Sequence, residues 1–487
     1  MRAISPISRD SLYRALAEVV GEEDITADPI QLYSYSFDAS AHHFVPDVVV
    51  RPESTEEVSR IVKLANELEV PVVPRGAATS LAGQATPILG GIVLDMVKMS
   101  RIKEVNLEDR YVVVEPGVVY DDLNAVLEPK GFVFPPAPAS SRVCTLGGAV
   151  ATNASGARAV KYGAVRDFVL GLEVVLPSGE IARFGGKCIK DSSGYQVARL
   201  FVGSEGTLGV ITEITLRIVP KPKYAVTCAA AFASLEDAGK AVAAIMASGI
   251  TPAALDLMDR YTLAAVRKAV APELPEADAL LIMEADGEPE IAKREIEEMA
   301  RIAREHGAIS LECSDDPKER ERLWKARKSV LPVLSRYSET TVSVPLIDDL
   351  SVPPSKVPAT IRAIEEASAR YGVDIGTYGH IGDGNLHCKV LIDVEDPDQW
   401  NRAFMAAYDI YRAVVELGGL LSGEHGVGIS KAPFALLQYG KPEIEAMRAL
   451  KEALDPVGIM NPGKFPERIP KHFVFRLRYP YRGEGWA

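Results

Sequence analysis

The segment at residues 379–387, Gly-His-Ile-Gly-Asp-Gly-Asn-Leu-His, constrains the fold more than any other part of the chain. Its Asp383-Gly384 dipeptide is typical of a two-residue turn between antiparallel strands. Such a hairpin places His380 directly opposite His387, with Cβ atoms about 4.5–5.5 Å apart on one face. Two imidazoles at this spacing can reach one divalent ion at about 2.0–2.1 Å.

A carboxylate that completes such a site follows later in the chain, at Glu424 in the segment Ser-Gly-Glu-His-Gly. Three protein ligands leave an open position for water or substrate, as in catalytic metal sites. The alternative is that His380 and His387 are polar residues on a solvated hairpin. We favour the metal site, because neutral imidazole is the commonest metal ligand.

Length and charge limit the class of protein. The 487 residues, 47% of them apolar and 25% charged, exceed what one core supports, so two or three domains are expected. No uncharged apolar run of about 18 residues occurs, and the N-terminus lacks the apolar region of a secretory signal. We therefore expect a cytoplasmic protein. The net charge of −13 disfavours nucleic-acid binding.

The five cysteines, at positions 144, 188, 228, 313 and 388, are odd in number and widely spaced. This pattern argues against a disulfide framework and against an iron–sulfur cluster, which needs closely spaced thiolates. Any electrons that the chain releases must therefore pass to another molecule.

Hydrophobic periodicity indicates two consecutive regions, each of which contains both helices and strands. A capping box at Ser54 to Glu57 predicts a helix, which is followed by a buried strand and a glycine loop. Further strands are expected at residues 92–94, 111–114, 169–176 and 209–218. A proline-rich linker at residues 219–223 ends this region. Beyond it, helices at 235–247, 290–304, 356–370, 400–417 and 442–454 accompany strands such as 279–285 and 388–392.

Three separate loops of small residues lie in the first region, at residues 75–83, 135–156 and 203–209. Small side chains let consecutive backbone N–H groups surround an anion such as a pyrophosphate. The first loop matches neither the Walker nor the G-x-G-x-x-G motif and could by itself be a tight turn. Together, the three loops indicate a long, flat ligand threaded through the fold.

The chain resembles the FAD-linked D-2-hydroxy acid dehydrogenases of the vanillyl-alcohol-oxidase flavoprotein superfamily, from about residue 45 to residue 465. This family includes D-lactate dehydrogenase, the flavin subunit of glycolate oxidase and D-2-hydroxyglutarate dehydrogenase. The motifs that carry the resemblance are Pro74-Arg75-Gly76, Thr145-Leu146-Gly147-Gly148, Asn153-Ala154-Ser155-Gly156, Tyr162-Gly163, residues 203–209, residues 379–387, Ser422-Gly423-Glu424-His425-Gly426 and Asn461-Pro462-Gly463-Lys464.

The resemblance implies an α+β fold. A two-subdomain FAD-binding domain of the vanillyl-alcohol-oxidase (PCMH) type is followed by an α+β substrate or cap domain with an antiparallel sheet. The expected divisions are a helical extension (1–44), the FAD-binding domain (45–220), the cap domain with the metal site (221–425), a segment returning to the FAD domain (426–465) and a tail (466–487).

The resemblance also implies FAD, held without a covalent bond because no histidine occupies the phosphate loop. The residues expected to bind it are Pro74, Arg75, Gly76, Ala77, Ala78, Thr79, Ser80, Gly83, Gln84, Pro138, Ser140, Thr145, Gly147, Gly148, Thr152, Asn153, Ser155, Gly156, Tyr162, Gly163, Glu205, Gly206, Gly209, Ile211 and Asn461.

The implied reaction is oxidation of a D-2-hydroxy acid to the 2-oxo acid. A divalent Zn, Mn or Fe ion at His380, His387 and Glu424 polarises the substrate, and His425 removes the hydroxyl proton. For His425, a role as a ligand or a helix-end residue is the alternative. Arg327 resembles the arginine that binds the substrate carboxylate, and a solvated helix face is its alternative. Asn385, together with the two hairpin histidines, is expected near substrate, or else it only forms the turn.

The chain departs from the family pattern at three positions. Ala78 stands where the family frequently has a glycine, and Ala137 stands where it commonly has an aspartate. Val342 is near the position at which some hydroxyglutarate-type members carry a second cationic residue. The last difference favours a small monocarboxylate such as lactate or glycolate. The expected electron acceptor is an electron-transfer flavoprotein, an iron–sulfur subunit, a quinone or a cytochrome. A homodimer is compatible with the sequence.

The tail after residue 466 mixes basic with aromatic side chains. We expect it to pack on the protein's own surface. The alternative is an arm that docks on a partner or on the inner face of a membrane.

Overall fold

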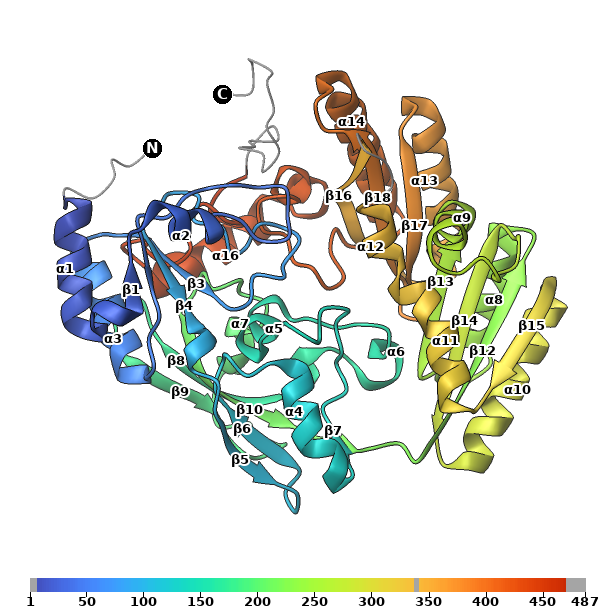
Figure 1. Ribbon diagram of the computed structural model, residues 1–487, viewed down its shortest axis with the longest axis horizontal. Helices are drawn as coiled ribbons and strands as arrows, with labels where there is room; N and C mark the ends of the chain where they lie inside the picture. Colours follow the sequence, from blue (N-terminus) through green and yellow to red (C-terminus); the bar gives the residue numbers. More distant parts are fainter. Residues whose placement is uncertain (1–6, 337–340, 470–487) are drawn as a thin grey trace.

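Three sheets organise the computed structural model, which describes residues 7–336 and 341–469 (Figure 1). We refer to residues 45–220 as the FAD region and to residues 221–425 as the cap region. The tail from residue 470 onward lies outside the described residues. No helix in the described ranges is long and apolar enough to cross a membrane.

The FAD region contains two of the sheets, and the first of them is extended by β1, which precedes the region in sequence. The first has the order β1-β2-β4-β3 and is parallel apart from β1, whereas the second is antiparallel with the order β5-β6-β10-β8-β9. Their strands are β1 Ile25–Thr26, β2 Val48–Val50, β3 Val72–Arg75, β4 Ile92–Asp95, β5 Ile102–Asn106, β6 Tyr111–Val114, β8 Val169–Val175, β9 Ile181–Gly185 and β10 Val210–Arg217. A short pair, β7 Phe132–Val133 with β11 Val219–Pro220, lies beside them.

Helices precede and connect these strands. They are α1 Arg9–Val20, α2 Pro29–Ser34, α3 Thr55–Glu67, α4 Tyr120–Leu127, α5 Leu146–Thr152, α6 Ala159–Tyr162 and α7 Ala198–Phe201. The predicted cap of α3 is confirmed, because Ser54 Oγ accepts a hydrogen bond from the backbone N–H of Glu57. The end of the chain returns to this region, since Asn461 N donates to Val72 O and Met460 pairs with the edge strand β3.

The cap region is built on one antiparallel seven-stranded sheet with the order β15-β12-β14-β13-β17-β18-β16. The strands are β12 Tyr224–Phe232, β13 Ala254–Asp259, β14 Ala279–Gly287, β15 Ala308–Ser314, β16 Thr341–Ser351, β17 Asp374–His380 and β18 Asn385–Asp393. The helices from here to the end of the described chain are α8 Leu235–Ala247, α9 Arg260–Ala269, α10 Pro289–Glu305, α11 Pro317–Lys328, α12 Val330–Leu334, α13 Val357–Tyr371, α14 Pro397–Glu416, α15 Ala435–Gln438 and α16 Lys441–Leu454.

The two faces of this sheet differ in chemistry. Alternate residues of a strand point to opposite faces, so Cys388 and Val390 of β18 pack in the core under α8, α10, α13 and α14. His387 and Lys389 point to the other face, where α9, α11 and α12 cover a smaller apolar cluster. This second face carries the polar residues of the site, and α6 of the FAD region lies beside it (Figure 1).

The predicted register of the histidine hairpin is wrong by two residues. Tyr378, not His380, is paired with His387, because four residues separate β17 from β18 instead of two. Only Gly384 of the expected turn has a positive φ, at 80°, whereas the primed two-residue turns that the dipeptide predicts need a positive φ at their first residue, here Asp383. A shift of two residues keeps His380 and His387 on the same face.

One cysteine pair also departs from expectation. The cysteine spacing argued against a disulfide framework, but Cys228 of β12 and Cys313 of β15 lie opposite each other and form a disulfide. They are 85 residues apart in sequence. Spacing along the chain carries no information about such cross-strand neighbours. Cys144, Cys188 and Cys388 are free thiols.

Gly384 provides a test of how tightly the hairpin end is packed. A Cβ at Gly384 would lie 1.7 Å from the carbonyl oxygen of Val352. We expect Gly384→Ala to lower the free energy of unfolding by at least about 3 kcal/mol, measured by urea denaturation. Gly418→Ala is the matched control, because Gly418 has a similar φ of 83° but open space around it. Its cost should be only about 1–2 kcal/mol, and equal losses would contradict the packing argument.

Candidate active site

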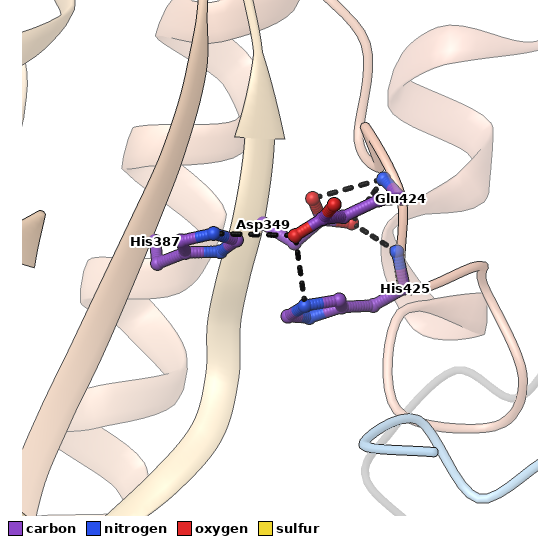
Figure 2. A group of neighbouring side chains, drawn as sticks. All are labelled: Asp349, His387, Glu424 and His425. Carbon is purple, nitrogen blue, oxygen red and sulfur yellow. Dashed lines mark hydrogen bonds and ion pairs between the residues drawn. The ribbon is translucent and has the colours of Figure 1, made fainter. Parts of the chain in front are cut away.

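One carboxylate oxygen lies at the centre of the site. Oε1 of Glu424 is 3.8 Å from Nε2 of His380, 3.3 Å from Nε2 of His387 and 3.5 Å from Nε2 of His425. Figure 2 shows His387 approaching from its strand and Glu424 and His425 from the loop after α14. The structure therefore brings together all three predicted metal ligands, and it adds His425 to the same cluster.

Two aspartates face the other ring nitrogens of these histidines. Asp256 Oδ1 lies 2.8 Å from His380 Nδ1. Asp348 lies 3.6 Å from His387 Nδ1 through Oδ1 and 3.1 Å from His425 Nδ1 through Oδ2. A carboxylate that accepts from one ring nitrogen fixes the imidazole so that the other nitrogen can bind a metal. Asp256 holds His380 through such a hydrogen bond, whereas Asp348 contacts the Nδ1 atoms of His387 and His425 through its charge.

Asp349 shapes the loop that carries Glu424. Its carboxylate accepts hydrogen bonds from the backbone N–H groups of Gly423, Glu424 and His425, and it pairs with Lys431 Nζ at 2.9 Å. One of its oxygens also lies within 4.8 Å of ligand atoms of His387, Glu424 and His425, so these four residues form a second possible ligand set (Figure 2). Because the Asp349 oxygens already accept these bonds, we assign it the positioning of the loop.

The charges around the site favour a cation at its centre. Burial lowers the pKa of His425, but Asp348 and Asp349 outweigh burial and raise this pKa to about 10. Burial raises the pKa of Glu424, yet hydrogen bonding to His387 and His425 holds it well below its usual value. The surrounding carboxylates therefore stabilise positive charge between these side chains.

Arg327 is buried beside the histidines rather than solvated. Only 8% of the residue is exposed. Its Nε lies 2.7 Å from Asp256 Oδ2, and its guanidinium lies over the ring of Tyr378, 4.6 Å from the centroid. Within residues 7–336 and 341–469, nothing accepts a hydrogen bond from its Nη1 or Nη2 atoms. This fork suits a carboxylate.

The side-chain amide of Asn385 supports the loop that carries Glu424 through Asp349. Its Nδ2 donates to Asp349 Oδ1 at 2.7 Å and to the carbonyl oxygen of Leu350 at 2.9 Å. The donor atoms of Asn385 are therefore used within the protein. Through Asp349, Asn385 therefore helps to hold the loop that carries Glu424.

The first small-residue loop has the form of an anion cradle. Among the described residues, no acceptor receives a hydrogen bond from the backbone N–H groups of Ala77, Ala78, Thr79 and Ser80. Ala78 has a φ of 52°, which explains why glycine is frequent there and lets successive N–H groups converge. The guanidinium of Arg75 fixes the start of the loop by donating hydrogen bonds to backbone carbonyl oxygens, including that of Phe37. These features fit a pyrophosphate.

The remaining cofactor loops lie against the first. A Cβ at Gly76 would be 2.2 Å from Thr145 Oγ1, and one at Gly156 would be 2.0 Å from the carbonyl oxygen of Ala137. A Cβ at Gly206 would likewise lie 3.3 Å from Cγ of Pro74. The three loops that are separate in sequence are therefore adjacent. Ile211, in contrast, packs in the core of the five-stranded sheet.

Three cofactor-loop residues also reach the loop that carries Glu424. Ser155 Oγ donates to Glu424 Oε2 at 2.9 Å, and Gln84 Nε2 donates to the carbonyl oxygen of His425 at 2.5 Å. Glu205 Oε1 accepts from the backbone N–H of Val427 at 2.8 Å. The expected flavin loops and the histidine–carboxylate centre therefore meet at one place.

An ionic clasp joins α6 to the cap sheet. Arg158 pairs with Glu284 at 2.6 Å and with Asp286 at 3.1 Å, and Lys161 pairs with Asp286 at 2.6 Å. The hydroxyl of Tyr162 donates to Asp286 as well, so its polar group serves the clasp. The sequence analysis missed this clasp and the three aspartates of the site. The Asp348-Asp349 pair inside an otherwise mostly apolar strand was a signal that could have been followed.

An anion cradle beside a buried histidine–carboxylate centre is consistent with a cofactor-dependent enzyme, and the family matches identify the cofactor class. Residues 46–185 match the FAD binding domain, and residues 221–465 match the C-terminal domain of the FAD linked oxidases. The chain belongs to the FAD-linked oxidases.

Named relatives cover most of the chain. It is 40% identical to a glycolate oxidase subunit of Bacillus subtilis (strain 168), over 92% of this chain and 95% of the relative. It is 35% identical to a mitochondrial D-lactate dehydrogenase [cytochrome] of Arabidopsis thaliana, over 93% and 79%. Among solved structures, p-cresol methylhydroxylase has a TM-score of 0.76 at 17% identity, covering 95% of this chain and 98% of that one. This likeness supports the expected PCMH-type fold.

The clasp predicts a specific loss of stability. The side chain of Asp286 is fully buried, so its replacement leaves Lys161 without its carboxylate and Arg158 with Glu284 alone. We expect Asp286→Asn to lower the free energy of unfolding by about 1–3 kcal/mol in urea denaturation. Glu288→Gln is the control, since its pair with Lys223 is mostly exposed, and it should cost less than about 0.5 kcal/mol. An unchanged Asp286→Asn midpoint would show that the clasp does not hold the regions together.

Proposed function

We propose that this protein oxidises a D-2-hydroxy acid of the lactate or glycolate type to the 2-oxo acid, using bound FAD, and that the electrons then pass to a separate acceptor. The observation that carries the proposal is the convergence of three imidazole Nε2 atoms on Glu424 beside the open guanidinium fork of Arg327. The names of the curated relatives, a glycolate oxidase subunit and a D-lactate dehydrogenase, support the same substrate class.

The residues present fit both groups that the reaction needs. When bound, the flavin takes up the α-hydrogen as hydride and a divalent Zn, Mn or Fe ion acts as a Lewis acid on substrate oxygen. We assign the ion to His380, His387 and Glu424, whose ligand atoms face one another. We assign the pyrophosphate to residues 77–80, whose N–H groups are available.

Arg327 binds the substrate carboxylate in this proposal. Its two Nη atoms match the two oxygens of a carboxylate, and the contact of Nε with Asp256 fixes the plane of the guanidinium. The substrate's carboxylate and hydroxyl groups are on adjacent carbons. Arg327 would bind the carboxylate, and His380 would hold the ion that acts on the hydroxyl oxygen. Both side chains contact Asp256, which keeps them next to each other.

His425 accepts the hydroxyl proton in this proposal. The positive charge of a bound divalent ion would lower the raised pKa of this imidazole, so that it is neutral before the reaction. It is the most exposed of the three histidines, with 19% of its side chain accessible compared with 5% for His387. Its Nδ1 faces Asp348, which stabilises the imidazolium that forms after proton transfer. A fourth ligand is the competing role, because its Nε2 lies 3.5 Å from Glu424 Oε1, compared with 3.3 Å for that of His387.

The choice of a monocarboxylate rests on the relatives and not on Val342. The structure places Val342 opposite Ile392, packed against the core on the far face of the cap sheet. Its side chain therefore does not face the site, and the sequence argument from this position does not apply. We retain lactate or glycolate because the relatives carry these names.

The acceptor is a separate molecule. The relative named as a subunit supports a protein partner such as an iron–sulfur subunit or an electron-transfer flavoprotein, and the relative named with a cytochrome supports that carrier. A quinone would require contact at the inner membrane face by an otherwise cytoplasmic protein. A homodimer stays compatible with all four.

Two other functions use the same fold. One is alkyl transfer on the flavin, and the other is electron relay without substrate chemistry. Both are less well supported, because the curated relatives are named as an oxidase subunit and a dehydrogenase. Net reduction of the flavin by a hydroxy acid separates these alternatives from the proposal.

The main test is anaerobic bleaching of the flavin. We expect D-lactate or glycolate to bleach the absorbance of the bound FAD in the metal-replete protein, and a chelator to slow this reduction strongly, because the Lewis acid is lost. L-lactate serves as the control substrate. If no member of a panel of 2-hydroxy acids reduces the flavin in the presence of Zn, Mn or Fe, the proposed function is wrong.

The role of His425 is tested by His425→Asn. We expect this variant to retain FAD and metal while single-turnover flavin reduction slows by about 10²–10⁴-fold, the usual worth of a general base. Metal content is measured alongside by elemental analysis. Loss of the metal would instead identify His425 as a ligand, and an unchanged rate would remove it from both roles.

A further inference from the structure

Two buried aspartates each contact two functional groups of the site. Asp256 lies on β13 and Asp348 on β16, at opposite sides of the β17–β18 hairpin, and each is 1% exposed. Neither belongs to a motif that pointed to the site in the sequence. The removal of a carboxylate from water costs several kcal/mol unless partners compensate it, so the identity of the partners shows what each carboxylate does.

Asp256 connects a histidine to the arginine fork. Its Oδ1 is 2.8 Å from His380 Nδ1, and its Oδ2 is 2.7 Å from Arg327 Nε. Its neighbours on β13, Leu255 and Leu257, point into the apolar core on the other face. An apolar side chain at position 256 would be compatible with the strand, but it would leave His380 and Arg327 without the carboxylate that orients them.

Asp348 connects the other two histidines. It faces His425 Nδ1 at 3.1 Å and His387 Nδ1 at 3.6 Å, and Lys389 Nζ balances its charge at 2.5 Å. The two imidazole rings are stacked, with centroids 5.1 Å apart and planes 11° from parallel. One carboxylate therefore sets the orientation of both rings, so that both Nε2 atoms point to Glu424.

We propose that Asp256 and Asp348 are positioning residues with different duties. Asp256 couples the orientation of His380 to that of Arg327, so it acts on both metal binding and substrate binding. Asp348 orients His387 and His425, so it acts on metal binding and proton transfer but not on the carboxylate fork. The inference rests on the proposed function for its substrate part and on the geometry alone for its metal part.

The variants Asp256→Asn and Asp348→Asn test this division in the FAD-loaded full chain. Each keeps the shape of the side chain and removes its charge. Asp259→Asn is the matched control. Asp259 is also a buried aspartate of β13, but it caps α9 and accepts hydrogen bonds from the backbone N–H groups of Thr262 and Thr377. It touches no site group.

Two measurements separate metal binding from substrate binding. Equilibrium dialysis with Mn²⁺ gives the metal affinity without any turnover. Stopped-flow flavin reduction at saturating Mn²⁺ over a D-lactate series gives the apparent substrate Kd. We expect both site variants to bind Mn²⁺ about 10–100-fold more weakly. The apparent Kd for D-lactate should rise by about tenfold in Asp256→Asn only, and Asp259→Asn should stay within about twofold on both measures.

The outcomes distinguish the inference from the proposed function. Unchanged Mn²⁺ binding in both site variants overturns the positioning roles, and so does an equal loss in Asp259→Asn, because the effect would then be general destabilisation. A raised substrate Kd in Asp348→Asn overturns the division of duties. If D-lactate and glycolate fail to reduce even the unmodified protein while Mn²⁺ binding falls as expected, the metal part stands and the proposed function fails. If Asp256→Asn does not retain FAD, Asp256→Ser replaces it.

Discussion

The carboxylate of Glu424, buried among three imidazoles, is the interaction on which the rest of the site depends. One of its oxygens faces the three Nε2 atoms, and the other accepts a hydrogen bond from Ser155 of the FAD region. A carboxylate in this position is costly unless its surroundings compensate it. The compensation comes from the histidines of β17, β18 and the loop after α14, and Asp256 of β13 and Asp348 of β16 hold these histidines in place, so the site exists only when these elements are assembled.

The cap sheet makes this assembly possible by dividing its two faces. On the outer face, four helices bury alternating apolar residues and supply the larger core. On the inner face, shorter helices cover only part of the sheet, and the strands present charged side chains there. The same two-residue period therefore gives stability on one side and chemistry on the other. The FAD region approaches the charged side through α6 (Figure 1).

Local patterns predicted most of the elements, and non-local contacts account for most of what was missed. The helix predicted at residues 235–247 coincides with α8, because its capping serine and apolar stripe are local signals. The hairpin histidines were placed on the correct face but in the wrong register, since the loop has four residues where the local Asp-Gly signal predicted two. Asp256 comes from a strand more than a hundred residues before its partner His380. No spacing rule connects such residues. The disulfide and the α6 clasp were missed for the same reason.

The hydrogen bond from Ser155 to Glu424 makes the centre of the cap region depend on the FAD region. The cap region cannot complete its own centre, because one of the two carboxylate oxygens is oriented by a loop that also adjoins the expected cofactor. A cap grafted onto a different flavin-binding domain would carry every histidine and still present a rotated glutamate. The two regions therefore act as one functional unit, because each supplies a part of the surroundings of Glu424.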